Sequence, residues 1–543
     1  MRFCEDGQAR QCPTGESAAT YRRDSLVWDN TNREYTMAVA HTFSRAQIGI
    51  DAPLVTVEAD ISSGLPQTLI VGLPETAVKE SKDRVKAAIV NSGFEMPQRR
   101  VTVNLAPADL PKQGGRYDLA IALSILGASG QIFSEKLAEL ELLGELALDG
   151  ALRPVKGILP AIIQNGAGTR KLLIPESNRS EASLGGNTSV LAANSLIDVV
   201  EFLRGSTQLQ TALENTPIPS SKPGRLITDI RGQYLAKRAL TIAAAGGHNI
   251  LLVGPPGAGK TMLASRLAAL LPPMNITESL EVASVQSISG YSLDVSAWGK
   301  RPFRSPHHTA SAVALVGGSN PPKPGEISLA HLGVLFLDEL PEFSRRVLEV
   351  LREPLESGKI VISRAKQHVT YPARFQLVSA MNPCPCGYYG DESNRCNCTM
   401  DRVERYRGRI SGPLMDRIDL HVDVPALPKG TLSDPKFKQD ENEHHKASQA
   451  IAAAQQKMRN RSRRLNAHLD VREVETSCRL TPHDQRLLDN AMERLGLSAR
   501  GYYKILKIAR TIADLEGDDK INTPHLTEAL GFRKLDKYKV QPI

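Results

Sequence analysis

Apolar residues in the first two hundred positions follow two different periods. Alternating or continuous short apolar runs predict strands, and an apolar stripe over residues 75–91 and an apolar run over 119–126 predict helices. The predicted strands cover residues 55–61, 69–71, 101–105, 142–148, 171–174 and 189–191. Strands and helices mixed in this order predict an α/β domain with its own core over residues 37–205.

The middle of the chain contains continuous apolar runs that predict buried strands. These runs cover residues 250–253, 333–337 and 375–382. Helices are predicted over residues 234–245, where Gly246 and Gly247 provide a suitable end, and over 262–271. We assign these elements to a second α/β domain over residues 226–425.

The last part of the chain has a helical pattern. Helices are predicted over residues 447–464, 497–515 and 523–530, which gives a helical domain over 426–543. Residues 206–225 combine several prolines with little apolar periodicity and predict a linker, and the charged stretch 436–443 is expected to be mobile. Residues 1–36 lack the apolar segment of a secretion signal. We expect a disordered leader there, with Met37 as a candidate start.

Composition narrows the class of protein. The chain has 543 residues, a net charge of +8 and a pI near 9.0, which permits a polyanionic partner without requiring one. No run of about 18 apolar residues occurs, so no membrane span is expected. Seven cysteines, four of them close together, favour a reducing compartment over a disulfide framework. We therefore expect a cytoplasmic protein.

The strongest motif follows the predicted strand 250–253. It has the form G-x-x-x-x-G-K-[ST], in which glycines allow backbone N–H groups to face phosphates at the start of a helix. The lysine neutralises phosphate charge and the hydroxyl coordinates Mg²⁺. The expected contacts to ATP are Gly254, Pro255, Pro256, Gly257, Ala258, Gly259, Lys260, Thr261 and Met262.

Two further apolar strands end in polar residues that suit phosphoryl transfer. Asp338 and Glu339 follow residues 333–337; we expect Asp338 to hold Mg²⁺ and Glu339 to polarise the attacking water. Asn382 ends the strand 375–382 and is placed to contact the γ-phosphate or the water. Together with the glycine loop, these residues predict ATP hydrolysis.

Four cysteines follow Asn382 directly. Cys384, Cys386, Cys396 and Cys398 form two C-x-C pairs within an insert over residues 384–398. Four thiolates suit tetrahedral Zn²⁺, although this spacing is tighter than in common zinc knuckles. The two interpretations are a structural zinc site and four reduced thiols.

Two segments admit more than one role. Arg304, His307 and His308 precede the acidic strand and form either a phosphate-contacting loop or a structural one. Because adjacent residues on a strand point to opposite sides, His307 and His308 are not expected to share a metal. The arginines that end the helix 447–464 either suit the helix dipole or contact a nucleic-acid backbone.

The order of glycine loop, acidic strand and Asn382 resembles the AAA+ ATPases, which form rings. The stretch around Arg417 resembles the finger segment of the branch that includes the magnesium chelatases, so the resemblance assigns the trans-acting arginine finger to Arg417, with Arg409 as the second choice. The helix after Ser498 is similar to a second sensor helix, in which Arg500 would reach the γ-phosphate.

The first domain resembles the proteolytic domain of the Lon family through Pro111-Lys112-x-Gly114 and the Gly144 and Pro154 motifs. The catalytic serine and lysine positions of that family fall near Arg116 and Ala161, so the domain is expected to be degenerate. Ser124 is expected to be a packed hydroxyl inside its helix.

Residues 101–112 and the cysteine insert resemble the ComM/YifB family of magnesium chelatase-like AAA+ ATPases. This resemblance implies a cytoplasmic hexamer that uses ATP, Mg²⁺ and DNA, and that promotes branch migration during natural transformation. Two alternatives stay open at this point. One is a protein-directed assembly ATPase or chaperone, and the other is a metal-insertion subunit like that of magnesium chelatase.

Overall fold

The computed structural model describes residues 39–133, 135–166, 168–186, 189–212, 226–290, 293–319, 321–364, 367–390, 395–427 and 441–533. The predicted leader 1–36 lies outside the described residues. The same is true of residues 213–225 of the predicted linker and of 428–440.

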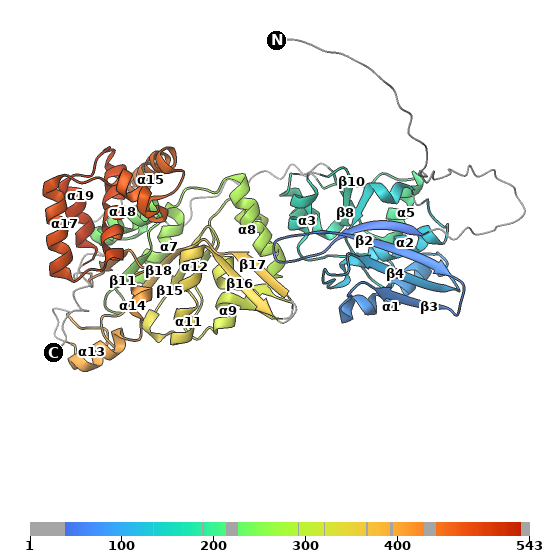
Figure 1. Ribbon diagram of the computed structural model, residues 1–543, viewed down its shortest axis with the longest axis horizontal. Helices are drawn as coiled ribbons and strands as arrows, with labels where there is room; N and C mark the ends of the chain where they lie inside the picture. Colours follow the sequence, from blue (N-terminus) through green and yellow to red (C-terminus); the bar gives the residue numbers. More distant parts are fainter. Residues whose placement is uncertain are drawn as a thin grey trace, which may run out of the picture. The chain divides into compact units, whose positions relative to one another are not determined.

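The amino-terminal region is an α/β unit built on one mixed sheet of eight strands, in the order β10-β9-β8-β5-β1-β2-β4-β3 (Figure 1). Val55, Val57 and Ala59 of β2 are fully buried, because alternate residues of this strand face the core. The strands are β1 Ala40–Arg45, β2 Leu54–Ser62, β3 Gln67–Val71, β4 Arg100–Ala106, β5 Leu140–Leu142, β8 Lys171–Pro175, β9 Val190–Ala193 and β10 Gln210–Thr211. The helices are α1 Thr76–Asn91, α2 Asp118–Ala128, α3 Ile158–Asn165, α4 Arg179–Ser183 and α5 Leu196–Arg204.

The prediction of one strand over residues 142–148 is wrong. Strand β5 ends at Leu142, and a separate hairpin pairs β6 Glu145–Leu146 with β7 Leu152–Arg153. The chain leaves the sheet at Gly144, whose N–H donates to the Arg116 carbonyl (3.1 Å). A Cβ at Gly144 would lie 2.9 Å from the Cδ2 methyl of Leu152, so a larger residue at this bend would require the Leu152 side chain to shift.

The middle region contains a parallel sheet of five strands in the order β12-β15-β18-β11-β19. These are β12 Phe303–Arg304, β15 Val334–Leu337, β18 Gln376–Met381, β11 Ile250–Val253 and β19 Leu420–Asp423. Ile250 and Leu252 pack into one core, and Leu251 and Val253 pack into another on the opposite face. A strand buried on both faces needs a continuous apolar run, which is why the sequence predicted β11 correctly.

Helices and short hairpins surround this sheet. Helices α6 and α7 contribute to the core that contains Ile250, and α10 and α11 contribute to the core that contains Leu251. The helices are α6 Tyr234–Gly246, α7 Lys260–Leu270, α8 Ile276–Ser289, α9 Ala312–Val316, α10 Glu326–Leu329, α11 Arg345–Glu349, α12 Arg352–Ser357, α13 Met400–Arg407 and α14 Gly412–Met415. The hairpins pair β13 Gly317–Gly318 with β14 Lys323–Pro324, and β16 Lys359–Arg364 with β17 Gln367–Pro372.

The carboxy-terminal region is helical. It contains α15 Glu441–Ser462, α16 Val471–Ser477, α17 Pro482–Leu495, α18 Ala499–Glu516 and α19 Thr523–Gly531. Helix α18 begins at a Ser498 cap and ends at Gly517, whose φ is +90°. Helices α15 and α18 both pack on α6, so the helical region shares a core with the middle region.

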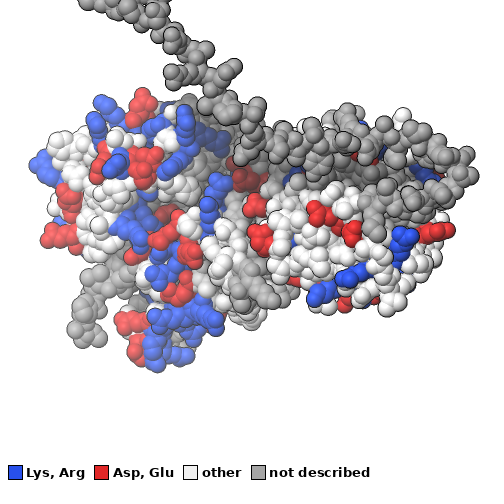
Figure 2. All heavy atoms as spheres, turned by 45° about the vertical axis from the view of Figure 1, so that its right-hand side comes forward, with Lys and Arg blue, Asp and Glu red and all other residues white. Residues whose placement is uncertain are grey.

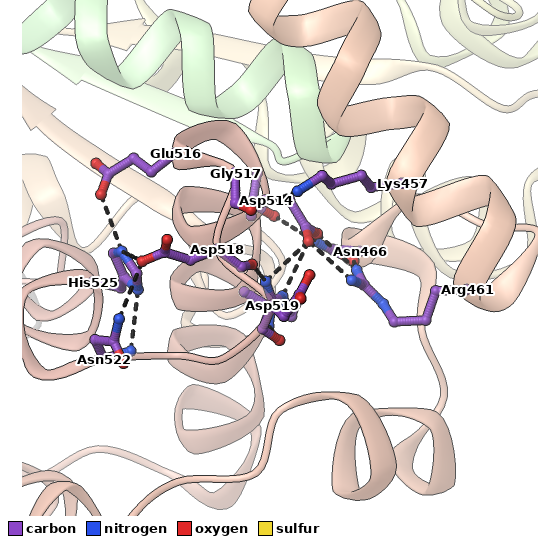
Figure 3. Close-up of polar contacts among 12 residues, drawn as sticks. Lys457, Arg461, Asn466, Asp514, Glu516, Gly517, Asp518, Asp519, Asn522 and His525 are labelled. Carbon is purple, nitrogen blue, oxygen red and sulfur yellow. Dashed lines mark hydrogen bonds and ion pairs between the residues drawn. The ribbon is translucent and has the colours of Figure 1, made fainter.

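A buried carboxylate fixes the end of α15 against α18 (Figure 3). Asp514 accepts hydrogen bonds from Arg461 (2.7 and 2.9 Å) and from Asn466 (2.9 Å), and its side chain is 1% exposed. Lys457 donates to the carbonyl of Gly517 (2.6 Å). Two of the basic residues at the end of α15 therefore have structural partners within this region.

Helix α15 begins earlier than predicted. Residues 441–443, which we expected to be mobile, form its first turn. Glu443 accepts two hydrogen bonds from Lys237 of α6 (2.8 and 3.1 Å). This tertiary ion pair extends the helix beyond the apolar pattern that predicted it.

Among the described residues, none of the helices is long and apolar enough to cross a membrane. On the face shown in Figure 2, acidic and basic side chains are interspersed over much of the surface, with a group of basic side chains at the lower edge. Away from that basic group, charges of both signs lie close together on the coloured part of this face.

Candidate nucleotide-binding and hydrolysis site

The glycine loop lies between β11 and α7, where the sequence predicted it. Gly257 and Gly259 have φ values of +78° and +87°, in the left-handed region that other residues rarely adopt. No side chain fits at Gly254, because a Cβ there would lie 2.1 Å from the Val424 carbonyl oxygen. The loop can therefore present its backbone N–H groups at the start of α7, which is the geometry of a phosphate-binding loop.

Parallel strands bring the polar residues of the site to one edge of the sheet. Lys260 donates from Nζ to the carbonyls of Gly254 (2.7 Å) and Pro255 (2.9 Å) and to Oδ1 of Asn382 (3.1 Å). Thr261 Oγ1 donates to Oδ2 of Asp338 (2.7 Å). Asp338 and Asn382 follow β15 and β18, which are adjacent strands, and β18 is adjacent to β11.

The charges at this edge influence one another. Burial lowers the pKa of Lys260, and the carboxylates of Asp338 and Glu339 oppose that shift. Asp338 and Thr261 supply the oxygen ligands that Mg²⁺ prefers. The residues present therefore fit a nucleotide with its magnesium ion.

Glu339 has an unusual backbone. Its φ and ψ are 52° and 47°, a left-handed conformation at a residue with a Cβ. Its N–H donates to Oδ1 of Asp338 (3.0 Å), and its carbonyl accepts from the N–H of Glu342 (2.7 Å). Its carboxylate pairs with His308, with 3.3 Å between Oε2 and Nδ1.

The segment before the acidic strand differs from the expectation. Strand β12 ends at Arg304, so His307 and His308 lie beyond it, where the alternation of a strand no longer applies. Their rings lie 4.1 Å apart rather than on opposite sides. Arg304 forms a bidentate ion pair with Glu326 (2.7 Å for both contacts).

The four cysteines come together as the spacing suggested. Their sulfur atoms lie within 4.8 Å of one another, with 3.2 Å between Cys384 and Cys386, 3.8 Å between Cys384 and Cys396, and 3.6 Å between Cys386 and Cys396. Tetrahedral sulfur ligands at about 2.3 Å from Zn²⁺ stand about 3.8 Å apart. The backbone N–H of Tyr388 lowers the pKa of Cys386 to about 6, which favours a thiolate there, whereas burial and the neighbouring thiols raise the pKa of Cys396 to about 11 and also raise that of Cys398. The cluster, which includes Cys398, therefore fits zinc.

The cysteine insert contacts the glycine loop, a contact that the sequence did not indicate. A Cβ on Gly387 would lie 2.5 Å from Cδ of Pro256. The insert and the phosphate-binding loop are thus packed against each other at this point.

The predicted arginine finger and the predicted sensor arginine lie together. Arg417 and Arg500 both contact Oε1 of Glu356 in α12, at 2.5 and 3.0 Å. They border a cavity of about 510 Å³, and the residues described along its border include none from 254–261. The alternative finger, Arg409, instead pairs with Glu342 (2.9 Å), three residues after Glu339. Arg500 thus lies at a cavity that the described residues of its own glycine loop do not border, and its contact with a γ-phosphate stays a prediction.

The amino-terminal region has no nucleophile and base at the positions aligned with the Lon family. Arg116 is buried and donates to the carbonyl of Lys156 (2.6 Å), and Ala161 is fully buried. Ser124 donates to the carbonyl of Ile121 (2.8 Å) inside α2, which confirms the packed hydroxyl. The likeness of the whole domain to the Lon fold stays a prediction.

The fold and the site define the class of protein. Family models for the magnesium chelatase subunit ChlI match residues 226–432 and 57–178, and a model for the carboxy-terminal part of that subunit matches 441–533. The chain is a multidomain α/β protein of the magnesium chelatase-like AAA+ class, with a helical carboxy-terminal region. Membership of this class implies the use of a nucleotide and Mg²⁺.

Similar proteins from other organisms show to which family of this class the chain belongs. Competence protein ComM of Haemophilus influenzae is 50% identical over 92% of this chain and 98% of its own length. A protein of Escherichia coli with the name YifB is 48% identical over 92% of this chain and 98% of its own length. The 38 kDa subunit of magnesium chelatase from Cereibacter sphaeroides is 26% identical over 56% of this chain and 90% of its own length. The chain belongs to the ComM/YifB family.

Proposed function

We propose that this chain is an ATP-driven DNA motor that acts as a cytoplasmic hexameric ring and promotes branch migration during natural transformation. The observation that carries the ATPase part is the meeting of Lys260, Thr261, Asp338 and Asn382 at one sheet edge. The DNA part rests on the family, whose relative in Haemophilus influenzae bears the name competence protein.

Each residue at the site has a proposed role. The backbone of residues 254–259 and Lys260 bind the phosphates of ATP, and Thr261 and Asp338 hold Mg²⁺, which neutralises phosphate charge when bound. Glu339 accepts a proton from the attacking water. Asn382, already hydrogen-bonded to Lys260, contacts the γ-phosphate or orients that water.

We infer that Arg417 and Arg500 serve the nucleotide of a neighbouring subunit. Both are paired with Glu356 at a cavity to which the glycine loop of the same chain does not contribute among the described residues. Phosphate bound by the next subunit would replace Glu356 as their partner. An arginine supplied in trans stabilises the charge of the transition state and makes hydrolysis depend on assembly.

A mixing experiment tests the shared site. Lys260→Ala subunits cannot bind phosphate productively, and Arg417→Ala subunits lack the finger, so each variant alone should be inactive. In mixed rings, a Lys260→Ala subunit still supplies Arg417 to a neighbour with an intact glycine loop, so part of the ATPase activity should return. If Arg417 acts within its own chain, mixing will restore nothing.

A basic cavity is the proposed contact with DNA. Its volume is about 500 Å³, and five arginines border it. They are Arg301, Arg374, Arg459, Arg463 and Arg464. Two carboxylates, those of Glu278 and Glu356, also border this cavity. Three of the arginines are paired with glutamates, Arg301 with Glu278, Arg374 with Glu281 and Arg464 with Glu473. Arg459 and Arg463 are therefore the proposed phosphate contacts, which supports the nucleic-acid alternative for the basic segment at the end of α15.

Hydrolysis measured with and without DNA separates the candidate functions. The proposed motor should hydrolyse ATP faster with single-stranded or branched DNA than without it. A protein-directed ATPase or chaperone would respond to a protein partner and to none of the DNA substrates. The metal-insertion alternative is less well supported, because the chelatase subunit matches 56% of this chain and the competence protein matches 92%.

We also propose that the four-cysteine cluster holds a structural Zn²⁺. Separations of 3.2 to 3.8 Å among the sulfur atoms of Cys384, Cys386 and Cys396 support three ligands around one ion. Cys398, whose sulfur lies within 4.8 Å of the other three, is the proposed fourth ligand. The ion would fix the insert that packs on Pro256.

A further inference from the structure

The described contacts of Glu339 point to a residue that no motif assigns to hydrolysis. The Glu339 side chain is 52% exposed, so its carboxylate has room for several rotamers. Holding an exposed glutamate in one orientation costs side-chain conformational entropy. A group that already fixes the carboxylate would remove that cost from the catalytic step.

His308 is in the right place to be that group. Its Nδ1 lies 3.3 Å from Oε2 of Glu339, which leaves Oε1 for another partner. The main chain of Glu339 is held separately by Asp338 and Glu342, as described above. The backbone of Glu339 is thus held by hydrogen bonds, and one oxygen of its carboxylate is in contact with the His308 ring.

His308 is itself held in place by its neighbours. Its ring lies 4.1 Å from the ring of His307 and makes an edge contact with Phe343 at 6.4 Å. His307 in turn bonds Thr309 through Nδ1 and Oγ1 (2.8 Å). Phe343 belongs to the turn that follows Glu339. The His308 ring therefore has contacts with its neighbour His307 and with the segment that carries Glu339.

The strained backbone of Glu339 agrees with a positioned residue. A left-handed conformation at a non-glycine residue is strained and persists only where the surroundings impose it. Strain of this kind gathers at functional sites, where it holds a group in the orientation that the reaction needs.

We propose that His308 is a positioning residue for ATP hydrolysis, which holds the Glu339 carboxylate so that its second oxygen meets the attacking water. In the reaction, the water oxygen forms a bond to the γ-phosphorus, the bond from that phosphorus to the bridging oxygen of ADP breaks, and the water proton passes to Glu339. His308 touches none of the reacting atoms and acts through Glu339. This inference rests on the proposed role of Glu339 in the ATPase.

Steady-state kinetics without DNA test the proposal with three variants. His308→Ala removes the contact to Glu339, and His308→Asn keeps a side-chain N–H donor near the position of Nδ1. His368→Ala is the matched control, because His368 is an exposed histidine whose ring bonds Ser363 across the β16–β17 hairpin. Thermal unfolding and ATP binding of all variants establish that they fold and bind nucleotide.

A positioning role predicts a split between the two kinetic constants. The kcat of His308→Ala should fall on the order of ten- to a hundred-fold, the range for a misplaced catalytic base, while KM for ATP stays within about two-fold. His308→Asn should recover most of the rate, and His368→Ala should match the wild type. In a Glu339→Gln background, His308→Ala should cause no further loss.

Three results would overturn the proposal. They are an unchanged or increased kcat in His308→Ala, a loss in His308→Asn as large as in His308→Ala, and an increase in KM that accounts for the whole loss. Failure of the proposed DNA motor would look different, because the wild type would then hydrolyse ATP at its basal rate with no stimulation by any DNA.

Discussion

Replacing Gly387 by alanine tests whether the cysteine insert supports the phosphate-binding loop. The new methyl carbon would lie 2.5 Å from Cδ of Pro256 and 2.8 Å from its Cγ. Carbon atoms pack at about 3.5–4.0 Å, so one of the two segments must move by about 1 Å. If four cysteines hold the insert around a metal ion, the glycine loop is the segment that moves.

The size of the effect follows from that displacement. A misplacement of about 1 Å at an active site lowers the rate on the order of a hundred-fold, which corresponds to about 2.7 kcal/mol of transition-state stabilisation. Gly387 also has a φ of +88°, and a Cβ in that region adds roughly 1–2 kcal/mol of strain. This second cost lowers stability and does not depend on the contact with Pro256.

Gly390→Ala is the matched control for this strain. Gly390 lies in the same insert with a φ of +78°, but a Cβ there would meet nothing within 4 Å. We expect kcat/KM for ATP to fall about a hundred-fold in Gly387→Ala and to change little in Gly390→Ala, with similar losses of thermal stability. Equal kcat/KM values in the two variants would refute the reasoning, because the insert would then yield without moving the loop.

Three further predictions concern DNA, metal and pH. Changing Arg459 and Arg463 together to alanine should weaken DNA binding across sequences and reduce the salt slope by about 2, measured by fluorescence anisotropy at several salt concentrations; an unchanged slope would contradict the basic cavity. The purified protein should contain one zinc per chain by elemental analysis, and Cys384→Ser should lose it. If all four cysteines of the cluster react with a thiol reagent in protein from which no metal has been removed, a metal site would be contradicted. Burial acts to raise the pKa of Asp419, but Lys504 (2.7 Å) and His248 outweigh it and hold the pKa well below its usual range. The stability that Asp419 contributes is therefore present above about pH 4 and lost as the pH falls further, so Asp419→Asn should lower the unfolding temperature at neutral pH and weaken its dependence on acid.

The sequence predicted the elements whose residue pattern reflects burial directly. Strand β11 matched residue for residue, because a strand covered on both faces must be continuously apolar. The glycine loop and the acidic pair were found because their chemistry requires fixed residue types at fixed spacing. Helix α18 was found from its apolar stripe and its terminal Gly517.

Features that depend on distant parts of the chain could not be predicted. Nothing local to Glu356 indicates that it pairs with both Arg417 and Arg500, since α12, the segment after α14 and α18 meet only in the folded chain. The contact of Gly387 with Pro256 depends in the same way on packing between separate loops. The early start of α15 depends on Lys237, which lies about two hundred positions away.

The basic end of α15 shows how one pattern can have two causes. Its arginines suggested either a helix dipole effect or contact with nucleic acid. Arg461 instead neutralises the buried Asp514, a partner in another helix. Arg459 and Arg463 border the basic cavity, so the pattern mixes a structural residue with candidate DNA contacts.

Movement of a four-way DNA junction by the purified protein tests the central claim most directly. A labelled junction is incubated with protein, Mg²⁺ and ATP, and its conversion to products is followed on a gel, with Lys260→Ala and an ATP analogue that resists hydrolysis as blanks. The proposed motor should convert the junction with wild-type protein and ATP and in neither blank. An assembled protein that hydrolyses ATP and leaves the junction unchanged would contradict the proposal.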